Sequence, residues 1–446
     1  MKIIQLHLVL SLILIIPVAC VAAAGQGGDD LPAYIRSKAK PLISAADLDR
    51  LVEDAGSRRL VLLGEASHGT HEYYAWRDSI SRRLIAEKGF RFIAVEGDWA
   101  SLYELNRYVK HMSGAASSAR EVLEQLERWP LWMWGNHEVV ALAEWMRAFN
   151  GDLPIEKRVG FYGKDVYDEW RSMDEVLDFL REHNRSLYRQ ARSHYACFSR
   201  YDGESWLYAQ MVAQGANDCV LAVESVVELF RQNDNALSQV AAEDFFYAKQ
   251  NALVVKHAER FYRLAVTRED ASSWNARVGY MNMTVNTLLD KYGEGSKGIV
   301  WAHNTHIGDA RFTEMAHFGQ QNIGHLARVD HGPDDVFLLG FATYEGTVKA
   351  GSSWGDRMQR MQVPPAREES AEDVFKETGL KQFLILFDEQ DRNHELFTQP
   401  MGNRAIGVVY NPGMDHRQNY INTIIPLRYD AIMFFRETSA LTPLFP

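Results

Sequence analysis

Acidic and histidine side chains stand at the ends of four short apolar runs in this chain. The runs and their polar residues are 59–68 with Glu65 and His68, 90–98 with Glu96 and Asp98, 159–165 with Asp165, and 298–306 with His303 and His306. Short runs bounded by turn signals are typical of strands buried on both faces, and open α/β sheets bind ligands at the carboxyl ends of their strands. If the four strands are parallel neighbours, these side chains meet in one cleft and form an acid/base site.

The segment 64–72, GEASHGTHE, places Glu65 and His68 in the turn that leaves the first of these strands. Histidine titrates near neutral pH and can remove a proton from water, while a carboxylate on its other ring nitrogen orients the ring. A surface turn with a helix cap at Ser67 or Thr70 is the structural alternative. The chemical interpretation makes His68 a candidate general base and Glu65 its orienting acid.

Glu96 ends the second apolar run, in the segment VEGDW at 95–99. A carboxylate in this position is often a cap for the following helix. Beside Glu65, however, it would share a cleft with a second carboxylate, and such pairs raise the pKa of one member. The expected arrangement is one carboxyl group that holds a proton and one that does not.

Two histidines three residues apart, His303 and His306, follow the last apolar run in WAHNTHIGDAR at 301–311. Such a pair can ligate a metal ion, or one ring can act on a substrate while the other packs in the core. Arg77 and Arg311 are candidate binders of a carboxylate or an oxyanion, because guanidinium stays charged and offers a rigid fork of donors. Satisfied core histidines and solvated arginines are the competing interpretations.

Two further segments have structural interpretations. The tryptophan-rich segment 129–150 favours core packing, with the lining of an apolar ligand pocket as the alternative. The segment 293–298, GEGSKG, fits GxGxxG, but it leads into a strand instead of opening a helix and is interpreted as a turn. The sequence has no GxSxG elbow, Walker loop or HExxH helix, which argues against a serine hydrolase or a nucleotide-binding enzyme.

The order of the elements predicts an α/β fold with a mostly parallel central sheet flanked by helices. A strand at 60–64, a helix at 73–88 and a strand from about 90 predict a right-handed crossover with a parallel, adjacent pair. Long helical patterns without a convincing strand fill about 167–291 and predict a large helical insertion before the fourth strand. Later strands are expected at 336–341, 383–387, 405–410 and 431–435.

Composition restricts the function classes. The chain has 446 residues, 46% of them hydrophobic and 24% charged, which is an ordinary globular composition. Its 48 basic and 59 acidic side chains give a net charge of -11, without a cluster of Lys and Arg suited to phosphates. We therefore expect no nucleic-acid partner. A small-molecule substrate is the expectation for the acid/base site, and a monomer is the starting expectation because the sequence is silent on oligomeric state.

The N-terminus predicts export. Lys2 is followed by an apolar stretch and by small residues up to Ala24, which is the pattern of a secretory signal peptide at 1–24, with the functional domain at 25–446. A lipoprotein anchor through Cys20 and an uncleaved membrane anchor are the alternatives. In a periplasmic or extracellular compartment, Cys197 and Cys219 can form a disulfide or remain buried thiols, without a catalytic role.

The ordered set of motifs resembles the erythromycin esterase family over about 42–444. The segments that carry the resemblance are GEASHG, VEGDW, WMWGNHEVVALAEWMRAFN, FYGKDVYDEW, WAHNTHIGDAR, NIGHLAR, GFATYEGTV, RAIGVVYNP and YDAIMFFRET. The resemblance implies a hydrolase that opens macrolactone esters, without a cofactor or metal, and a possible place in the response to antibiotics. It assigns the general base to His68, its acidic neighbour to Glu65, and further site residues to Arg77, Glu96, His303 and His306.

Two other hypotheses use the same residues differently. In the first, His68, Glu96, His303 and His306 supply ligands for a divalent metal whose bound water attacks the ester. In the second, the exported protein binds a hydrophobic ligand through the tryptophan-rich segment without converting it. The signal peptide is a departure from cytoplasmic resistance esterases, and the resemblance therefore does not identify the substrate.

Overall fold

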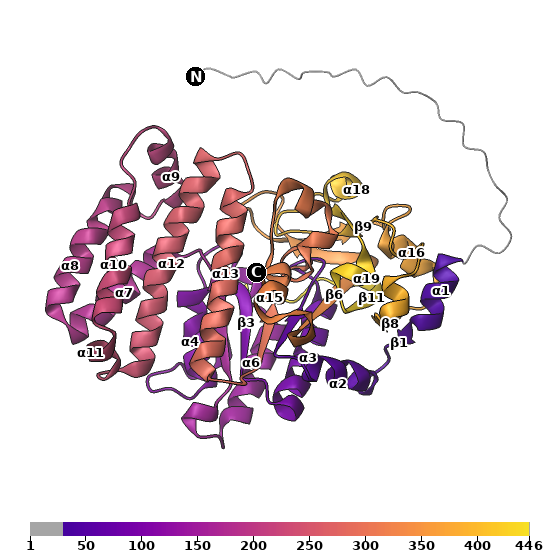
Figure 1. Cartoon of the computed structure of the whole chain (residues 1–446), viewed down its shortest axis with the longest axis horizontal. Coiled ribbons are helices and arrows are strands. Elements are labelled where there is room, and N and C mark those ends of the chain that lie inside the picture. Colours follow the sequence, from indigo (N-terminus) through magenta and orange to yellow (C-terminus); the bar gives the residue numbers. More distant parts are fainter. Residues whose placement is uncertain (1–29, 446) are drawn as a thin grey trace.

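The computed structural model describes residues 30–445, so the expected signal peptide with Cys20 lies outside the described residues. Its centre is a nine-stranded sheet in the order β1-β8-β11-β6-β2-β5-β3-β4, with β7 paired to β6 (Figure 1). The strands are β1 (Lys40–Pro41), β2 (Leu60–Leu63), β3 (Phe92–Asp98), β4 (Gly160–Asp165), β5 (Gly298–Trp301), β6 (Val336–Ala350), β7 (Gln359–Val363), β8 (Gln382–Leu386) and β11 (Ala431–Thr438).

The six strands from β11 to β4 are all parallel, whereas β8, β1 and β7 join the sheet antiparallel. The predicted α/β fold with a mostly parallel sheet is therefore confirmed. The predicted adjacency of β2 and β3 is wrong, because β5 pairs with both and lies between them. The crossover leaves room for one more strand, and the completely buried run of β5 fills that position.

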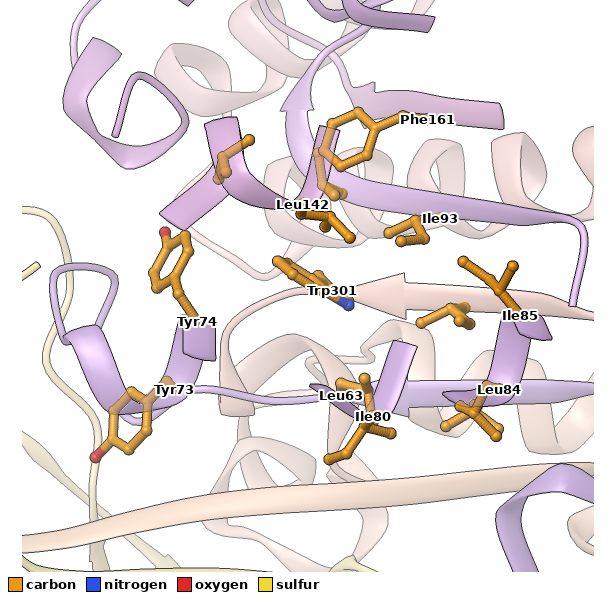
Figure 2. Packing of buried hydrophobic residues seen from close by; sticks show 14 of the residues in the cluster. Leu63, Tyr73, Tyr74, Ile80, Leu84, Ile85, Ile93, Leu142, Phe161 and Trp301 are labelled. Carbon is orange, nitrogen blue, oxygen red and sulfur yellow. The ribbon is translucent and has the colours of Figure 1, made fainter. Parts of the chain in front are cut away.

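One face of the sheet is covered by α3 (His71–Lys88) and α6 (His137–Asn150) (Figure 2). Trp301 from β5 packs there edge-on against Tyr74 from α3, with ring centroids 6.3 Å apart. Gly89 ends α3 with a φ of 73°, a left-handed conformation that glycine adopts without strain. This helix and its stop agree with the pattern of apolar residues in the sequence.

The other face packs against α13 (Ser272–Tyr292) and α15 (Ile323–His331). The remaining described helices outside the insertion are α1 (Leu31–Lys38), α2 (Asp49–Gly56), α4 (Trp99–Val109), α5 (Ala119–Leu123), α14 (Asn304–Ile307), α16 (Ala371–Glu377), α17 (Glu389–Arg392), α18 (Asp415–Gln418) and α19 (Ile425–Arg428). Within residues 30–445, no helix combines the length and the apolarity needed to cross a bilayer.

The segment between β4 and β5 is helical throughout and holds a hydrophobic cluster of its own. Its helices are α7 (Glu169–His183), α8 (Arg185–Tyr195), α9 (Ser205–Ala213), α10 (Val220–Gln232), α11 (Asp234–Ser238), α12 (Ala242–Thr267) and α13. Figure 1 shows them as a bundle beside the sheet, with α13 nearest to it.

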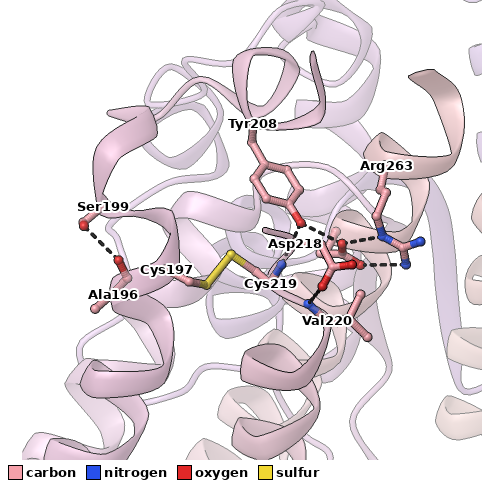
Figure 3. Close-up of a disulfide and its surroundings, with 9 residues drawn as sticks. Ala196, Cys197, Ser199, Tyr208, Asp218, Cys219, Val220 and Arg263 are labelled. Atoms are coloured by element: carbon pink, nitrogen blue, oxygen red, sulfur yellow. Dashed lines mark hydrogen bonds and ion pairs between the residues drawn. A yellow bond between two sulfur atoms is a disulfide. The ribbon is translucent and has the colours of Figure 1, made fainter. Parts of the chain in front are cut away.

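A disulfide between Cys197 and Cys219 joins two parts of this insertion, with Cα atoms 6.0 Å apart (Figure 3). Beside it, the Tyr208 hydroxyl accepts the backbone N–H of Cys219 at 3.0 Å and donates to Glu259 at 2.7 Å. Of the two alternatives for these cysteines, the structure shows the paired one.

The predicted strand at 405–410 is wrong. A small antiparallel sheet of β9 (Met401–Arg404) and β10 (Tyr420–Thr423) stands near it, and 405–410 crosses the edge of the main sheet as a loop. Single bridges hold this loop, one between Ile406 and Ser67 and one between Val409 and Gly351. Ile406 and Tyr410 pack on β6 and β7, whereas Ala405, Gly407 and Val408 line a cavity, so the loop has an apolar pattern without pairing along its length. The segment 293–298 is a turn between α13 and β5, as expected.

Candidate active site

A cavity of about 420 Å³ opens at the carboxyl ends of β2, β3, β4 and β5. Side chains that follow these strands form its floor, α13 forms a wall, and loops after β6 and β9 form the opposite side. Its lining includes His68, Glu96, Arg128, Met133, Asp165, Tyr167, Trp274, Arg277, His303, Thr305, His306, Trp354, Val408 and Tyr420. The strand-end residues of the four apolar runs therefore meet at one edge of the sheet.

Glu65 holds His68 in one orientation. Its Oε1 lies 2.8 Å from His68 Nδ1, and its Oε2 accepts from Arg77 Nη2 at 2.7 Å. Because the carboxylate already accepts from Arg77, the His68 nitrogen at this contact is the donor, and the lone pair of the neutral ring sits on Nε2. That nitrogen has no hydrogen-bond partner among residues 30–445, and the ring borders the cavity.

Glu65 also tunes the basicity of His68. Burial alone lowers the pKa of this imidazole, but the hydrogen bond and charge of Glu65, together with the charge of Glu96, raise it above its ordinary value. The ring is therefore a stronger base than a free histidine, while its Nε2 stays open to the cavity. This combination suits proton abstraction from a water molecule.

His303 lies against His68, with ring centroids 4.9 Å apart. Its Nδ1 accepts the backbone N–H of Thr305 at 3.3 Å, which makes Nε2 the protonated nitrogen of the neutral ring. Burial and the neighbouring His68 lower its pKa well below the ordinary value, so the ring is neutral at physiological pH. The Nε2–H group is buried and makes no hydrogen bond of normal geometry within the described residues, although the Ala66 backbone lies close enough to the ring to oppose the lowering of its pKa, and the residue lines the cavity.

Glu96 connects the other half of the site. Its Oε1 lies 3.2 Å from His306 Nε2 and 3.0 Å from Arg277 Nη2, and its Oε2 accepts the backbone N–H of His303 at 3.0 Å. Burial opposes its charge, but His306, His68 and Arg277 lower its pKa well below the usual value. The carboxylate therefore stays ionised. It holds the segment that carries both late histidines.

His306 differs from His303 in its surroundings. Its ring stacks on Trp274, with centroids 4.7 Å apart and planes at 9°, and burial lowers its pKa despite the charge of Glu96. Arg277 binds Asp165 through Nε at 2.8 Å and Nη2 at 2.5 Å, in a two-point contact. Both Trp274 and Arg277 belong to α13, so the insertion completes the wall of the cavity.

Three expectations differ from the structure, and the first two concern the arginines expected to bind a substrate carboxylate or oxyanion. Arg77 has no exposed surface, lies under Glu65 between Tyr74 and Trp301, and does not border the cavity, so it supports the site from below instead of contacting a substrate. Arg311 also lies outside the cavity lining and pairs with Asp309 at 2.6 Å.

The expected pairing of Glu65 with Glu96 is the third difference. Because β5 separates β2 from β3, each carboxylate has its own cationic partner, Arg77 for Glu65 and Arg277 for Glu96. The pKa of Glu96 is lowered instead of raised, because positive groups and not a second carboxylate surround it.

Sequence reasoning missed Arg277, Arg128 and Lys164. Arg277 lies inside a helical pattern far from any strand end, and no local signal marks it. The Arg128 guanidinium donates two hydrogen bonds, each of 2.6 Å, to the Asp98 carboxylate at the wall of the cavity. Lys164 precedes Asp165 on β4 with its amine buried and unpaired, and burial lowers its pKa to about 8. A lysine inside an apolar strand was the one available signal.

The aromatic segment 129–150 serves mainly as core, as its composition favours. Trp132 and Trp134 are buried, while Pro130 and Met133 reach the cavity.

The residues expected as metal ligands in the alternative hypothesis do not form a preassembled metal site. In the described part of the chain, no three His, Cys, Asp or Glu side chains are grouped as a metal ion requires. The alternative ligands His68, Glu96, His303 and His306 line the cavity, but Glu96 is already occupied by Arg277.

Known proteins resemble this chain in sequence and fold. The family described as erythromycin esterase matches residues 85–438. Erythromycin esterase type II of Escherichia coli is 22% identical over 363 residues, which cover 76% of this chain and 83% of that protein.

Among solved structures, a succinoglycan biosynthesis protein has a TM-score of 0.75 at 20% identity, over 94% of this chain and 100% of the other. A mutant of the erythromycin esterase EreC in its open conformation has a TM-score of 0.66 at 14% identity, over 91% and 96%. At such identities, the structural likeness shows a shared fold and not a shared substrate.

Proposed function

The chain belongs to the erythromycin esterase family, and we propose on this basis that it hydrolyses a carboxylic ester, with macrolactones as the first substrates to test. The family relationship supports an esterase-type hydrolase. The observation that carries the mechanism is the His68 ring, whose Nδ1 is held by Glu65 while Nε2 faces the cavity beside His303.

The proposed reaction begins with water. Nε2 of His68 removes one proton while the water oxygen bonds to the ester carbonyl carbon, which leaves a tetrahedral oxyanion and an imidazolium stabilised by Glu65. Collapse of this intermediate breaks the bond to the leaving oxygen, which takes the proton back from His68. The products are a carboxylic acid and an alcohol, joined in one open chain if the substrate is a lactone.

His303 is the proposed donor to the oxyanion. Its buried Nε2–H group makes no hydrogen bond of normal geometry within the described residues, and its ring is kept neutral, so it can donate without breaking an ion pair. A preorganised donor of this kind stabilises charge that develops only in the transition state, with an effect of about 3 kcal/mol. His306, stacked on Trp274 and paired with Glu96, positions its neighbours.

The test replaces His68 with glutamine and compares it with His71→Gln. His71 makes a similar contact with Glu138, at 2.7 Å from Nδ1, but it lies on the surface outside the catalytic cavity. Ring opening of a macrolide and lactone panel is followed by mass spectrometry. We expect His68→Gln to lower kcat/KM by about 10³-fold, within the range of general-base catalysis, and His71→Gln to change it little. Equal turnover in the two variants would exclude His68 as the base.

The metal-dependent alternative predicts a different result. If a divalent ion held by His68, Glu96 and a late histidine activates the water, chelation abolishes turnover and a stoichiometric metal accompanies the purified protein. The proposed mechanism expects full turnover in chelator. Elemental analysis and turnover measured on the same sample decide between the two.

The third hypothesis is a binder without turnover. It predicts saturable binding of an apolar ligand by wild type, with no product over many enzyme equivalents. The same panel measured for binding and product separates capture from conversion.

Inactivation of a macrolide outside the cytoplasm is the proposed biological role, and it depends on export. The sequence pattern of 1–24 supports export. N-terminal sequencing of the protein recovered from the host would test it, because cleavage after Ala24 gives a chain that starts at Gly25.

A further inference from the structure

The catalytic cavity has two chemically different sides. His68, Glu96, Asp165 and Arg277 line it at the sheet edge and on α13, whereas the lining residues that follow β6 in the chain are all uncharged at neutral pH. A volume of about 420 Å³ accommodates a ligand of drug size, which is larger than the simplest esters. The proposed hydrolysis uses the ionisable side, so the uncharged side is available to bind the part of a substrate that does not react.

Trp354 is the largest side chain on this uncharged side. It belongs to the loop 351–357, which follows β6, and it is 59% exposed although it borders the cavity. Its indole N–H donates no hydrogen bond within residues 30–445. Since a tryptophan ring is mainly apolar surface with one polar group, a ligand that covers this ring removes a large apolar area from water.

The ring of Trp354 is held in place by its neighbours. It packs against Trp129, with ring centroids 4.6 Å apart and planes at 57°. Nε1 of Trp129 donates to the backbone carbonyl of Asp356 at 2.9 Å, which fixes the loop that carries Trp354. At the base of the loop, a Cβ on Gly351 would meet Cζ2 of Trp129 at 3.1 Å, and the Gly351 N–H donates to the Val408 carbonyl at 2.9 Å. A wall that is fixed in advance loses little conformational freedom when a ligand binds.

We propose that Trp354, supported by Trp129, is a specificity-determining residue that selects esters whose non-reacting part carries an uncharged ring. A ring covers the indole face more completely than a flexible alkyl chain with the same number of carbons, and it loses fewer rotatable bonds on binding. A charged group would leave water without finding a counter-charge on this side of the cavity. The proposal rests on the proposed ester hydrolysis, because it assigns a substrate feature to the same cavity.

Two sets of esters test the proposal. The first set is methyl 3-phenylpropanoate, methyl 3-cyclohexylpropanoate and methyl nonanoate, which carry an aromatic ring, a saturated ring or an open chain of equal carbon number at the same distance from the carbonyl group. The second set is 3-phenylpropyl, 3-cyclohexylpropyl and nonyl acetate, which carry the same groups on the alcohol side. Because the reacting group is unchanged within each set, differences in kcat/KM report the binding of the remote group.

We expect wild type to hydrolyse a ring ester of at least one set with a kcat/KM about tenfold above that of the matching alkyl ester. Trp354→Ala should raise KM for the ring ester about tenfold and for the alkyl ester much less, which removes the preference. The effect should fall on KM and not on kcat, because the remote ring is bound equally in the ground state and the transition state. Trp354→Phe should keep most of the preference, and the better ring ester shows whether the ring is aromatic or saturated.

Trp206→Ala is the control, because Trp206 is a tryptophan on α9 that is 45% exposed and does not border the cavity. If wild type hydrolyses ring and alkyl esters equally in both sets, or if Trp354→Ala and Trp206→Ala behave alike, the assignment of Trp354 is wrong while ester hydrolysis stands. If wild type forms no product from any ester of the two sets, the proposed hydrolysis is wrong, and the assignment of Trp354 falls with it.

Discussion

The sheet edge and the helical insertion bury their polar groups in opposite ways. At the sheet edge, ionised side chains are packed together without exposure, and each carboxylate has a cation or an imidazole as partner. In the insertion, the interior is mainly apolar and aromatic, and a disulfide ties it together. Burial of charge at the sheet edge lowers the free energy of unfolding but fixes the positions of the chemical groups. The insertion has the mainly apolar interior that is usual for packed helices.

The two regions meet at α13. This helix belongs to the insertion, yet Trp274 and Arg277 on one of its faces complete the catalytic cavity. A helix whose folding follows local periodicity can therefore supply a functional group whose role depends on the region it packs against.

Removal of the Glu65 charge should have the largest effect on turnover of the substitutions at the sheet edge. In Glu65→Gln, the ring of His68 loses its orienting carboxylate, and Arg77 is left buried without a counter-charge. We expect kcat to fall by about 10³-fold. The pKa of His68 should fall as well, because burial then acts without the opposing carboxylate.

The pH dependence of activity in Glu65→Gln is a more specific test of this role than the loss of kcat. A base works when deprotonated, so activity is lost as the pH falls through the pKa of His68. In wild type this acid limb should lie above the ordinary histidine value, and in Glu65→Gln the limb of the residual activity should move to lower pH. An unmoved limb would show that Glu65 does not tune His68.

Arg277→Gln tests whether the insertion serves the site. It leaves Asp165 and Glu96 without their shared cation, and loss of one partner of a buried pair costs roughly 3–4 kcal/mol of unfolding free energy. Turnover should fall because Glu96 no longer holds His306 and the His303 backbone in place. Arg171→Gln is the control, since this α7 arginine makes an ion pair at 3.7 Å near the surface.

The readout for Arg277 is urea unfolding together with the pH dependence of kcat. A purely structural role changes only the unfolding curve. A positioning role also shifts the pH profile, because the charge of Arg277 acts on His68 and on His306. Arg277→Lys should restore part of the charge effect but not the two-point contact with Asp165.

Lys164→Met should stabilise the protein, in contrast to the two preceding variants. Burial lowers the pKa of Lys164 from 10.5 to about 8, which corresponds to a penalty of about 3 kcal/mol at neutral pH. In the window between these values the unfolded chain binds more protons, so wild-type stability rises with pH there. The advantage of Lys164→Met should therefore be largest near pH 7 and vanish near pH 10.5. A pH-independent difference would contradict it.

The smallest effect is expected in the interior of the insertion. Cys197→Ser with Cys219→Ser opens a loop closed over 22 residues and should lower unfolding free energy by about 2 kcal/mol. Turnover at a temperature where the variant is folded should not change, because neither cysteine lines the catalytic cavity. A loss of activity in the folded variant would mean that the insertion interior controls the site.

The sequence was most informative where residue types act locally. The strand-end positions of Glu96 and His303, the stop of α3 at Gly89, and the helical character of the insertion all follow from short-range patterns, and the structure agrees with them. The loop 405–410 is the counterexample, because packing of Ile406 and Tyr410 on neighbouring strands selects the same apolar residues as pairing in a sheet.

The α/β fold and the types of group that meet at the sheet edge follow from the amino-acid sequence, because hydrophobic periodicity and strand-end placement are local properties, and the family follows from the order of its motifs. Tertiary structure alone decided which groups are partners. The insertion of β5 between β2 and β3 separated Glu65 from Glu96, and the docking of α13 brought Arg277 to Glu96 and Asp165. Strand order and helix docking depend on contacts between residues more than a hundred positions apart, which no local pattern encodes.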